Sequence, residues 1–491
     1  MREKYISLWI GFSIFLNFIA GCNPPKDQLK IFNGYYENLD LVNAEIYAES
    51  KIRKTNDQKP DGDDLLWTLQ TASVKYLKND CNGSSQYFDK CENMLNYFDH
   101  QNEIASAVVS AIINDNAVAY LGEEYDGIMV NTYKALNFMI LGQDDLVRVE
   151  FNRALDRQRI AREKFAKEIE KLKNQIAKEQ QKNANIQKNL DNPEIQTLIK
   201  QKNPAAYEYQ AYPDFINPFS TYLASLYFNL IQDHHKAETL IKESSAMLPE
   251  NSYIQSDLEI TENILNGNGN FQNTLWVIFE NGLGPVKEEF RIDLPLFIVT
   301  NKVKYVGIAL PKLKNREPAY THLLINDTIK NYQTEIVADM DRVIQTEFNK
   351  DFQAALTRAI ISATLKAAAQ YALAEQNSQG ANIASIVVAA YAFVTNAADV
   401  RVWTALPKNF QVAKLNIPQN REIKIFSPQG ALILDLKIPR CNNAVAYVKI
   451  PTKMATPSCN IIPFYGAKYE NFITDYIYGF SFSQWLQRQN R

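Results

Sequence analysis

The sequence predicts a multidomain α+β protein. An N-terminal all-α region of tetratricopeptide-like helices precedes a β-sandwich-like domain, which an Ala-rich helical hairpin interrupts. Apolar residues recur with helical spacing from about 64 to 265. Short β-branched and aromatic runs begin after the turn-forming segment Asn266–Asn270. Residues 380–398 carry no charge and are rich in alanine, which indicates an unusual helical insertion.

The composition indicates a folded chain and excludes several classes of function. The 491 residues are 46% hydrophobic and 22% charged, which supports a sizeable core. The 52 basic and 55 acidic residues give a net charge of −3, so we expect no nucleic-acid partner. Only four histidines and five cysteines are present, and no His-Glu-x-x-His, Gly-x-Ser-x-Gly or phosphate-loop motif occurs. We therefore predict no catalytic residue, no metal site and no cofactor.

The N-terminus has the pattern of a lipoprotein signal peptide over residues 1–21. Arg2 and Lys4 precede an apolar stretch that ends in Ile19-Ala20-Gly21-Cys22. Small residues before a cysteine are what lipoprotein signal cleavage requires, because the cysteine thiol becomes alkylated and its freed amine becomes acylated. An ordinary signal peptide or a membrane anchor is the alternative, but the apolar stretch is shorter than the roughly 20 residues that span a bilayer. We predict lipidation at Cys22.

The residue after the cysteine bears on localisation. Asn23 stands where aspartate commonly retains bacterial lipoproteins in the inner membrane, so we expect the outer membrane, with the chain anchored by acyl chains on its periplasmic face. Residues 22–62 are polar and mixed, and we predict a tether leading to the first helix. Packing of Tyr35, Tyr36, Leu39 and Leu41 onto the body is the alternative.

The remaining cysteines are even in number, as expected for disulfides in an oxidising compartment. Neighbours in sequence make the simplest pairs, which joins Cys81 to Cys91 and Cys441 to Cys459. Buried free thiols are the alternative, since four cysteines allow three pairings.

The predicted helical domain covers residues 63–265. In its clearest repeat, small, aromatic and turn residues keep the spacing of a tetratricopeptide-like helix pair, and a second copy ends at Pro249. The positions in the clearest copy are Ala135, Phe138, Gly142, Val147, Phe151 and Ala154. A long polar helical arm over 145–200 separates the copies, and we expect it to be a solvated arm rather than a coiled coil.

The predicted β-rich domain consists of residues 271–338 and 400–480. Eight short runs bounded by Pro, Gly or Asn read as strands. They are 275–279, 290–294, 305–310, 322–325, 410–415, 422–426, 432–438 and 445–450. The Ala-rich hairpin over 339–399 splits this set, and its small residues leave three roles open: burial against the rest of the protein, oligomer contact, or membrane insertion.

Several short motifs resemble an uncharacterised family of proteobacterial lipoproteins with tetratricopeptide-like helices. They are Glu280–Pro285 after Trp276–Phe279, Gly307–Pro311, Ala398–Trp403 with Leu406-Pro407, and Tyr133–Asn137 with Val149–Arg153. The resemblance covers most of the chain after the signal peptide, except the polar arm. It implies an envelope component with protein partners, and it transfers no catalytic residues.

These features together predict a non-enzymatic outer-membrane lipoprotein that serves as a protein-binding scaffold or assembly factor. Repeat grooves bind peptides through aromatic anchors. The expected groove residues are Tyr133, Asn137, Phe138, Tyr222 and Tyr227. A periplasmic or outer-membrane protein is the expected partner, with self-association as an alternative. Two rival functions are a subunit of an export or pore assembly that uses the Ala-rich hairpin, and a cell-wall-acting enzyme.

Overall fold

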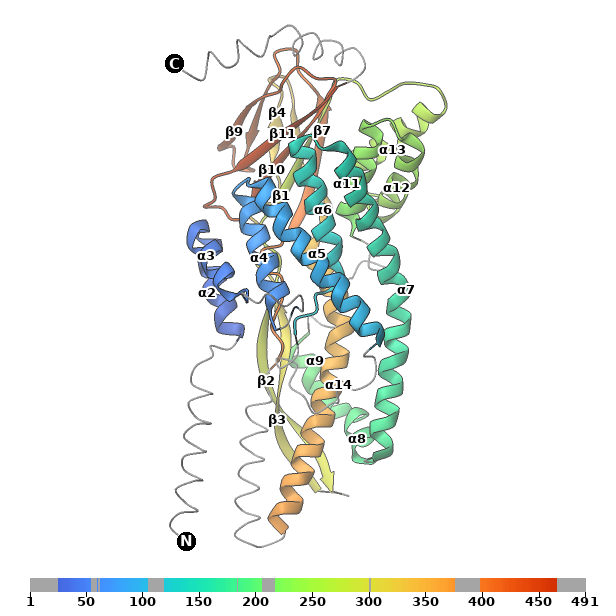
Figure 1. The fold of residues 1–491 in the computed structure, drawn as a ribbon, viewed down its shortest axis with the longest axis vertical. Helices are drawn as coiled ribbons and strands as arrows, with labels where there is room; N and C mark the ends of the chain where they lie inside the picture. Colours follow the sequence, from blue (N-terminus) through green and yellow to red (C-terminus); the bar gives the residue numbers. More distant parts are fainter. Residues whose placement is uncertain are drawn as a thin grey trace.

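The fold is mixed α+β, with helices in the N-terminal half and most strands in the C-terminal half, and about half of it is helical (Figure 1). The computed structural model describes residues 25–53, 60, 62–104, 119–182, 184–204, 217–299, 302–375 and 398–465. The predicted signal peptide and Cys22 lie outside the described residues. The predicted α+β class is therefore confirmed.

The first two helices of the described residues lie within the predicted tether and replace most of it. Helices α2 (Pro25–Glu37) and α3 (Leu41–Lys51) form a hairpin that packs into the main core through Phe32 and Ala44. The Phe32 ring meets the Trp67 ring edge-on, with 6.1 Å between centroids. The prediction of a tether over residues 22–62 is wrong for these helices, because their apolar side chains recur at helical spacing and are buried.

The remaining helices of the N-terminal half follow as neighbouring pairs. Short turns join α4 to α5, α6 to α7 and α11 to α12, and the two members of each pair pack together. Gly142 has a φ of 67° and ends α6, a backbone conformation that glycine adopts without strain. The helices are α4 (Asp64–Leu77), α5 (Cys81–Ile104), α6 (Glu124–Leu141), α7 (Asp144–Lys182), α8 (Ala184–Leu190), α9 (Pro193–Lys202), α11 (Pro218–Leu230), α12 (His234–Met247) and α13 (Ser252–Leu265).

Two sheets and a long hairpin contain the described strands. The five-stranded sheet has the order β11-β10-β1-β7-β6, in which β1 and β10 are parallel and the other neighbours antiparallel. The four-stranded sheet has the order β5-β4-β8-β9. The strands are β1 (Thr274–Asn281), β2 (Val286–Val299), β3 (Lys302–Lys314), β4 (Leu324–Asn326), β5 (Asn331–Gln333), β6 (Glu335–Asp339), β7 (Asn409–Asn416), β8 (Glu422–Phe426), β9 (Leu432–Lys437), β10 (Asn443–Ile450) and β11 (Ser458–Phe464).

The central strands of the five-stranded sheet are buried on both faces. Trp276 and Ile278 on β1 belong to the core shared with the helices, whereas Leu275 and Val277 belong to the core shared with the four-stranded sheet. Alternate residues of a strand point to opposite faces, so one strand serves both cores. The helices, the five-stranded sheet and the four-stranded sheet therefore form three successive layers.

An arm extends from these layers, built from β2, β3 and α14 (Met340–Glu375) with the far part of α7 beside it (Figure 1). Ile292 and Leu294 on β2 pack against Phe352 and Leu356 on α14, and Ile195 of α9 joins them. Helix α14 is the described part of the predicted Ala-rich hairpin, and residues 376–397 lie outside the described residues. In the described part of the chain, no helix combines the length and the apolar character that a membrane span needs.

Each of the eight predicted strands overlaps an observed one, and β5, β6 and β11 were not predicted. Strand β5 has only three residues, which is too short for a periodicity to register. The polar arm predicted over 145–200 corresponds to α7, α8 and most of α9.

The four cysteines among the described residues are unpaired, so the predicted disulfides are wrong in this structure. Cys81 and Cys91 both lie on α5, where ten residues place them about 15 Å apart, and a disulfide needs Cα atoms within about 7 Å. Cys459 stands beside Val448 near the end of β10, whereas Cys441 precedes the start of that strand. The two thiols of each proposed pair therefore cannot meet.

Candidate functional site

The candidate site is centred on Glu280, an acidic residue on the helix-facing side of the central strand β1. It follows Trp276 and Ile278 at alternate positions, so its side chain points toward the helices as theirs do. Tyr447 on β10 and Tyr76 on α4 approach it from the sheet and from the helical layer. A carboxylate thus lies where the main core otherwise holds apolar side chains.

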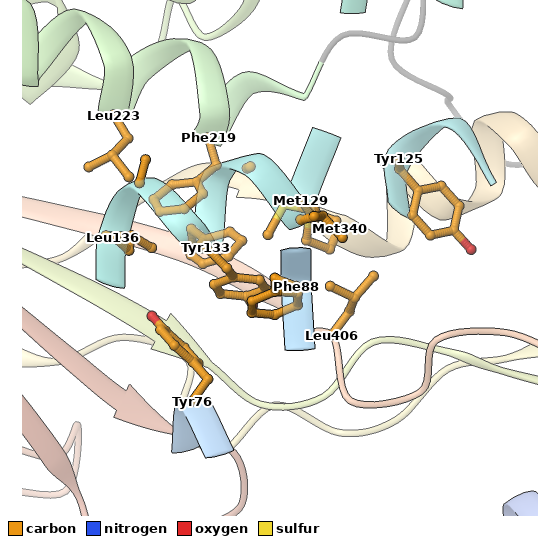
Figure 2. Close-up of a cluster of buried hydrophobic side chains, with 14 of the residues drawn as sticks. Tyr76, Phe88, Tyr125, Met129, Tyr133, Leu136, Phe219, Leu223, Met340 and Leu406 are labelled. Carbon is orange, nitrogen blue, oxygen red and sulfur yellow. The ribbon is translucent and has the colours of Figure 1, made fainter. Parts of the chain in front are cut away.

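Three tyrosine hydroxyls donate to this carboxylate. Tyr447 Oη lies 2.6 Å and Tyr76 Oη 3.3 Å from Glu280 Oε2, while Tyr133 Oη lies 3.1 Å from Oε1. The rings of Tyr76 and Tyr133 are 4.6 Å apart, and Phe88 stacks on Tyr133 (Figure 2). Burial raises the pKa of all three phenols well above the usual value, so they stay protonated donors.

A lysine completes the group. Lys449 on β10 donates to the Tyr76 carbonyl at 2.7 Å and to Asn79 Oδ1 at 2.8 Å, and its ammonium lies 4.1 Å from the Tyr76 ring centroid. Burial lowers the pKa of Lys449 to about 8, and the nearby charge of Glu280 opposes that shift. Burial likewise raises the pKa of Glu280, against the Tyr447 hydrogen bond and the lysine.

A small recess opens beside this group, and we call Glu280, Tyr76, Tyr133, Tyr447 and Lys449 the Glu280 cluster. The recess is about 10 Å³, room for about one water molecule, and is also lined by Tyr36, Ser73, Gly282 and Ala405. The hydrogen bonds from the three phenols occupy both oxygens of Glu280, so the carboxylate is held rather than presented to a ligand. The cluster therefore ties α4 and α6 to the two parallel strands of the sheet.

The predicted groove residues do not form a surface. Tyr133, Asn137, Tyr222 and Tyr227 are buried, and Phe138 is partly buried against the main core. The groove prediction is therefore wrong: the small and aromatic positions that suggested it are the ones that pack the helices together. Of the predicted residues, only Tyr133 joins the Glu280 cluster.

The other buried predicted residues hold neighbouring elements together. Tyr222 on α11 donates to Asp257 on α13 at 2.9 Å, and Asp257 also accepts from the Trp276 indole and pairs with Lys414 at 2.7 Å. Tyr227 donates to the Asp144 carbonyl at the start of α7. Both hydroxyls satisfy buried polar groups between elements.

Asn137 also serves a structural contact, between α6 and α5. Its Nδ2 lies 3.1 Å from Ser84 Oγ and 3.2 Å from Ser85 Oγ. Its Oδ1 is buried and has no hydrogen-bond partner among the described residues. Because the whole side chain is buried, it presents nothing to a partner protein.

A second polar cluster lies between α5, α6 and α7 around Lys134, which is 2% exposed. Its Nζ lies 2.7 Å from Asp89, 2.7 Å from Glu92 and 3.0 Å from Glu150. Arg153 approaches Glu92 and Glu150 from the solvent side. One buried cation therefore neutralises carboxylates from two neighbouring helices.

A third cluster offers the only carboxylate oxygens among the described residues that lie close enough together to hold a cation. Oxygens of Glu123, Glu347 and Asp351 fall within 4.8 Å of one another. Lys287 donates to Glu123 at 2.7 Å, and the Glu124 backbone N–H donates to Glu347 at 2.8 Å. Hydrogen-bond donors of the protein itself thus already bind Glu123 and Glu347.

Beside that cluster, Asp126 is buried at the third position of α6. Its Oδ2 accepts from Tyr120 Oη at 2.6 Å and from the Glu123 backbone N–H at 2.9 Å, and Oδ1 has no partner among the described residues. Burial raises the pKa of Asp126 to about 7, although both hydrogen bonds favour its ionised form.

Asp126→Asn is expected to remove a pH-dependent loss of stability. A carboxyl whose folded pKa lies above its unfolded value costs nothing at pH 3, and destabilises the fold progressively as the pH rises from about 4 to about 7. The amide keeps an acceptor for both donors and cannot ionise. We expect the variant to match wild type near pH 4 and to exceed it by about 3 kcal/mol at pH 8, measured by chemical denaturation across pH.

The exposed Asp145 provides the control, because Asp145→Asn makes the same chemical change at the surface. A variant of Asp126 whose stability runs parallel to wild type from pH 4 to pH 8 would contradict the raised pKa.

The Glu280 cluster was missed in the sequence, although a signal for it exists. Glu280 lies at an alternate position from the buried Trp276 and Ile278, so it shares their face of the strand. Lys449 shares a face with Val445 and Tyr447 in the same way. A charged residue on the buried face of a strand indicates that it has a polar partner inside the core. The helical partner Tyr76 lies far away in sequence and carries no such signal.

The chain matches no protein-family model, no curated protein and no solved structure.

Proposed function

We propose that this chain is a lipid-anchored protein of the bacterial envelope, which faces the periplasm from the outer membrane and acts as a scaffold for a protein partner rather than as an enzyme. In this proposal the helix pairs α6–α7 and α11–α12 are tetratricopeptide-like units, and the two sheets form a sandwich-like domain. The Glu280 cluster then serves rigidity rather than catalysis, because both of its carboxylate oxygens are occupied.

The observation that carries the proposal is the position of the folded body relative to the predicted lipid. The lipobox ends at Cys22, and α2 begins at Pro25. Acyl chains on Cys22 would hold the body against the membrane with almost no slack, as suits a scaffold with a fixed orientation. Such chains anchor a protein through the burial of their methylenes, each worth about 0.8 kcal/mol.

Exposed apolar side chains outside the helical layer are candidates for the partner surface. Ile329 is 92% exposed at the turn between β4 and β5, and Met454 is 88% exposed after β10. Asp327 fixes the Ile329 turn, since its Oδ1 accepts from the backbone N–H groups of Ile329 and Lys330 at 2.9 and 2.7 Å. An apolar side chain held on a rigid turn is a suitable anchor for a protein partner.

Cys22→Ser is expected to abolish acylation and release the protein from the outer membrane. Mass spectrometry of the wild-type chain should find diacylglycerol and a third acyl chain on Cys22, and membrane fractionation should place it with the outer membrane. A photo-crosslinking residue at position 329 should capture a specific protein in wild-type cells and lose it in the Cys22→Ser strain.

An exposed position on a different element, Gln353 on α14, supplies the control for crosslinking. An unmodified Cys22 in the mature wild-type chain, or an identical crosslink pattern at positions 329 and 353, would overturn the proposal.

A further inference from the structure

The outward side of the α2–α3 hairpin carries the most concentrated apolar exposure near the N-terminus. Val42 and Ile46 on α3 are each 60% exposed, and Ile31 on α2 is 38% exposed. Val42 and Ile46 are one helical turn apart, on the side of α3 opposite the buried Ala44 and Ala48. We call Ile31, Val42 and Ile46 the hairpin patch.

The rest of the hairpin is fixed, so the hairpin patch has a defined orientation. Glu45 pairs with Lys75 and, at 2.6 Å, with Lys78, both on or next to α4. Tyr87 on α5 donates to Glu49 at 2.8 Å. These contacts clamp one flank of α3 to the body and direct the hairpin patch away from it.

The residues that precede the hairpin patch in the chain indicate what this surface contacts. Two residues, Asn23 and Pro24, separate Cys22 from Pro25, so the Cα atom of the acylated residue would lie within about 10 Å of the start of α2. Exposed Lys26 and Lys30 on the first turns of α2 lie beside that point and suit anionic headgroups. An anchor so close brings the hairpin to the bilayer surface.

We propose that the hairpin patch lies on the phospholipid bilayer, with Val42 and Ile46 in the headgroup region and Lys26 and Lys30 at the lipid phosphates. This inference rests on the lipid anchor proposed above and adds a specific docking face to it. Apolar side chains and lysines together supply the second contact that a lipid anchor commonly needs for a fixed pose. The bilayer then sets the orientation of the arm and of the Ile329 turn.

The test is a spin label at Ile46→Cys in the lipidated, full mature protein, reconstituted into vesicles of phosphatidylethanolamine and phosphatidylglycerol. On reconstitution, collisions of the label with oxygen should rise relative to collisions with a water-soluble nickel chelate, by several-fold. A label at Ile329→Cys should stay in water and show no change. The native cysteines other than Cys22 are buried or partly buried, and labelling of the unmodified protein measures their contribution.

A second variant examines the contact itself. Val42→Ser in the Ile46→Cys background should reduce the oxygen preference at position 46, without loss of fold because residue 42 points into solvent. An aqueous label at position 46, or one shielded from both reagents by another protein copy, would overturn the bilayer contact. Mass spectrometry on the same sample shows whether Cys22 is acylated, so failure of this inference is distinguishable from failure of the anchor.

Discussion

Glu280→Ala is expected to lower the free energy of unfolding by about 4–6 kcal/mol, the largest effect of any single substitution considered for this protein. The change leaves the hydroxyls of Tyr76, Tyr133 and Tyr447 without their acceptor, and each unsatisfied buried hydroxyl costs about 1–3 kcal/mol. Lys449 also loses its nearest counter-charge. Denaturant unfolding followed by circular dichroism measures the loss.

Two variants separate the hydrogen bonds from the general effect of truncation. Glu280→Gln keeps the size and one acceptor, so we expect a loss of about 1–2 kcal/mol. Glu288→Ala removes a glutamate that is 38% exposed and pairs with Lys314, and it should change stability by less than about 0.5 kcal/mol. Equal losses for Glu280→Ala and Glu288→Ala would show that the cluster does not hold the helices to the sheet.

Lys134→Met should destabilise the helical layer by about 3–5 kcal/mol. The substitution keeps the side-chain length but removes the only buried cation beside Glu92 and Glu150, and it leaves their carboxylates in a poorly solvated place. Arg153, which is 50% exposed, recovers part of that cost from outside. Thermal and denaturant unfolding measure the loss, and a similar change at the exposed Lys242, which pairs with Glu238, should have little effect.

A compensating substitution makes the Lys134 prediction specific. Glu92→Gln together with Glu150→Gln removes the uncompensated charges, so the triple variant should regain a large part of the stability lost in Lys134→Met. If the triple variant loses as much unfolding free energy as its three substitutions lose separately when added together, packing rather than charge explains the role of Lys134.

The main periodicities of the chain were readable from the sequence. The segments around Trp276 and Val412 have the apolar or alternating sequences that are typical of buried strands. The long run of polar residues with helical spacing indicated the length of α7. These are local signals, which one segment carries by itself. The α+β class followed from their order along the chain.

What could not be predicted depends on which residues meet in space. Tyr133 was predicted to be a surface anchor, but its hydroxyl donates to the buried Glu280. The sequence around Tyr133 does not show this contact, because Glu280 lies on a distant strand. Cys81 and Cys91 looked like a disulfide until α5 proved continuous across both. The α2–α3 hairpin was predicted to be a tether, since its partners lie far away in sequence: Trp67 packs against Phe32, Arg316 pairs with Glu37 and Thr404 donates to Asn33.

The parallel pairing of β1 with β10 has a consequence for how the protein reaches its fold. About 160 residues separate the two strands, and at roughly 5–20 residues per second a ribosome needs about 8–30 s to add them. Throughout that interval the helical layer and Trp276 lack the strand that completes their core. A nascent chain of this design would therefore depend on chaperones until about its last tenth emerges. A truncation before Asn443 would leave an aggregation-prone fragment instead of a smaller folded protein.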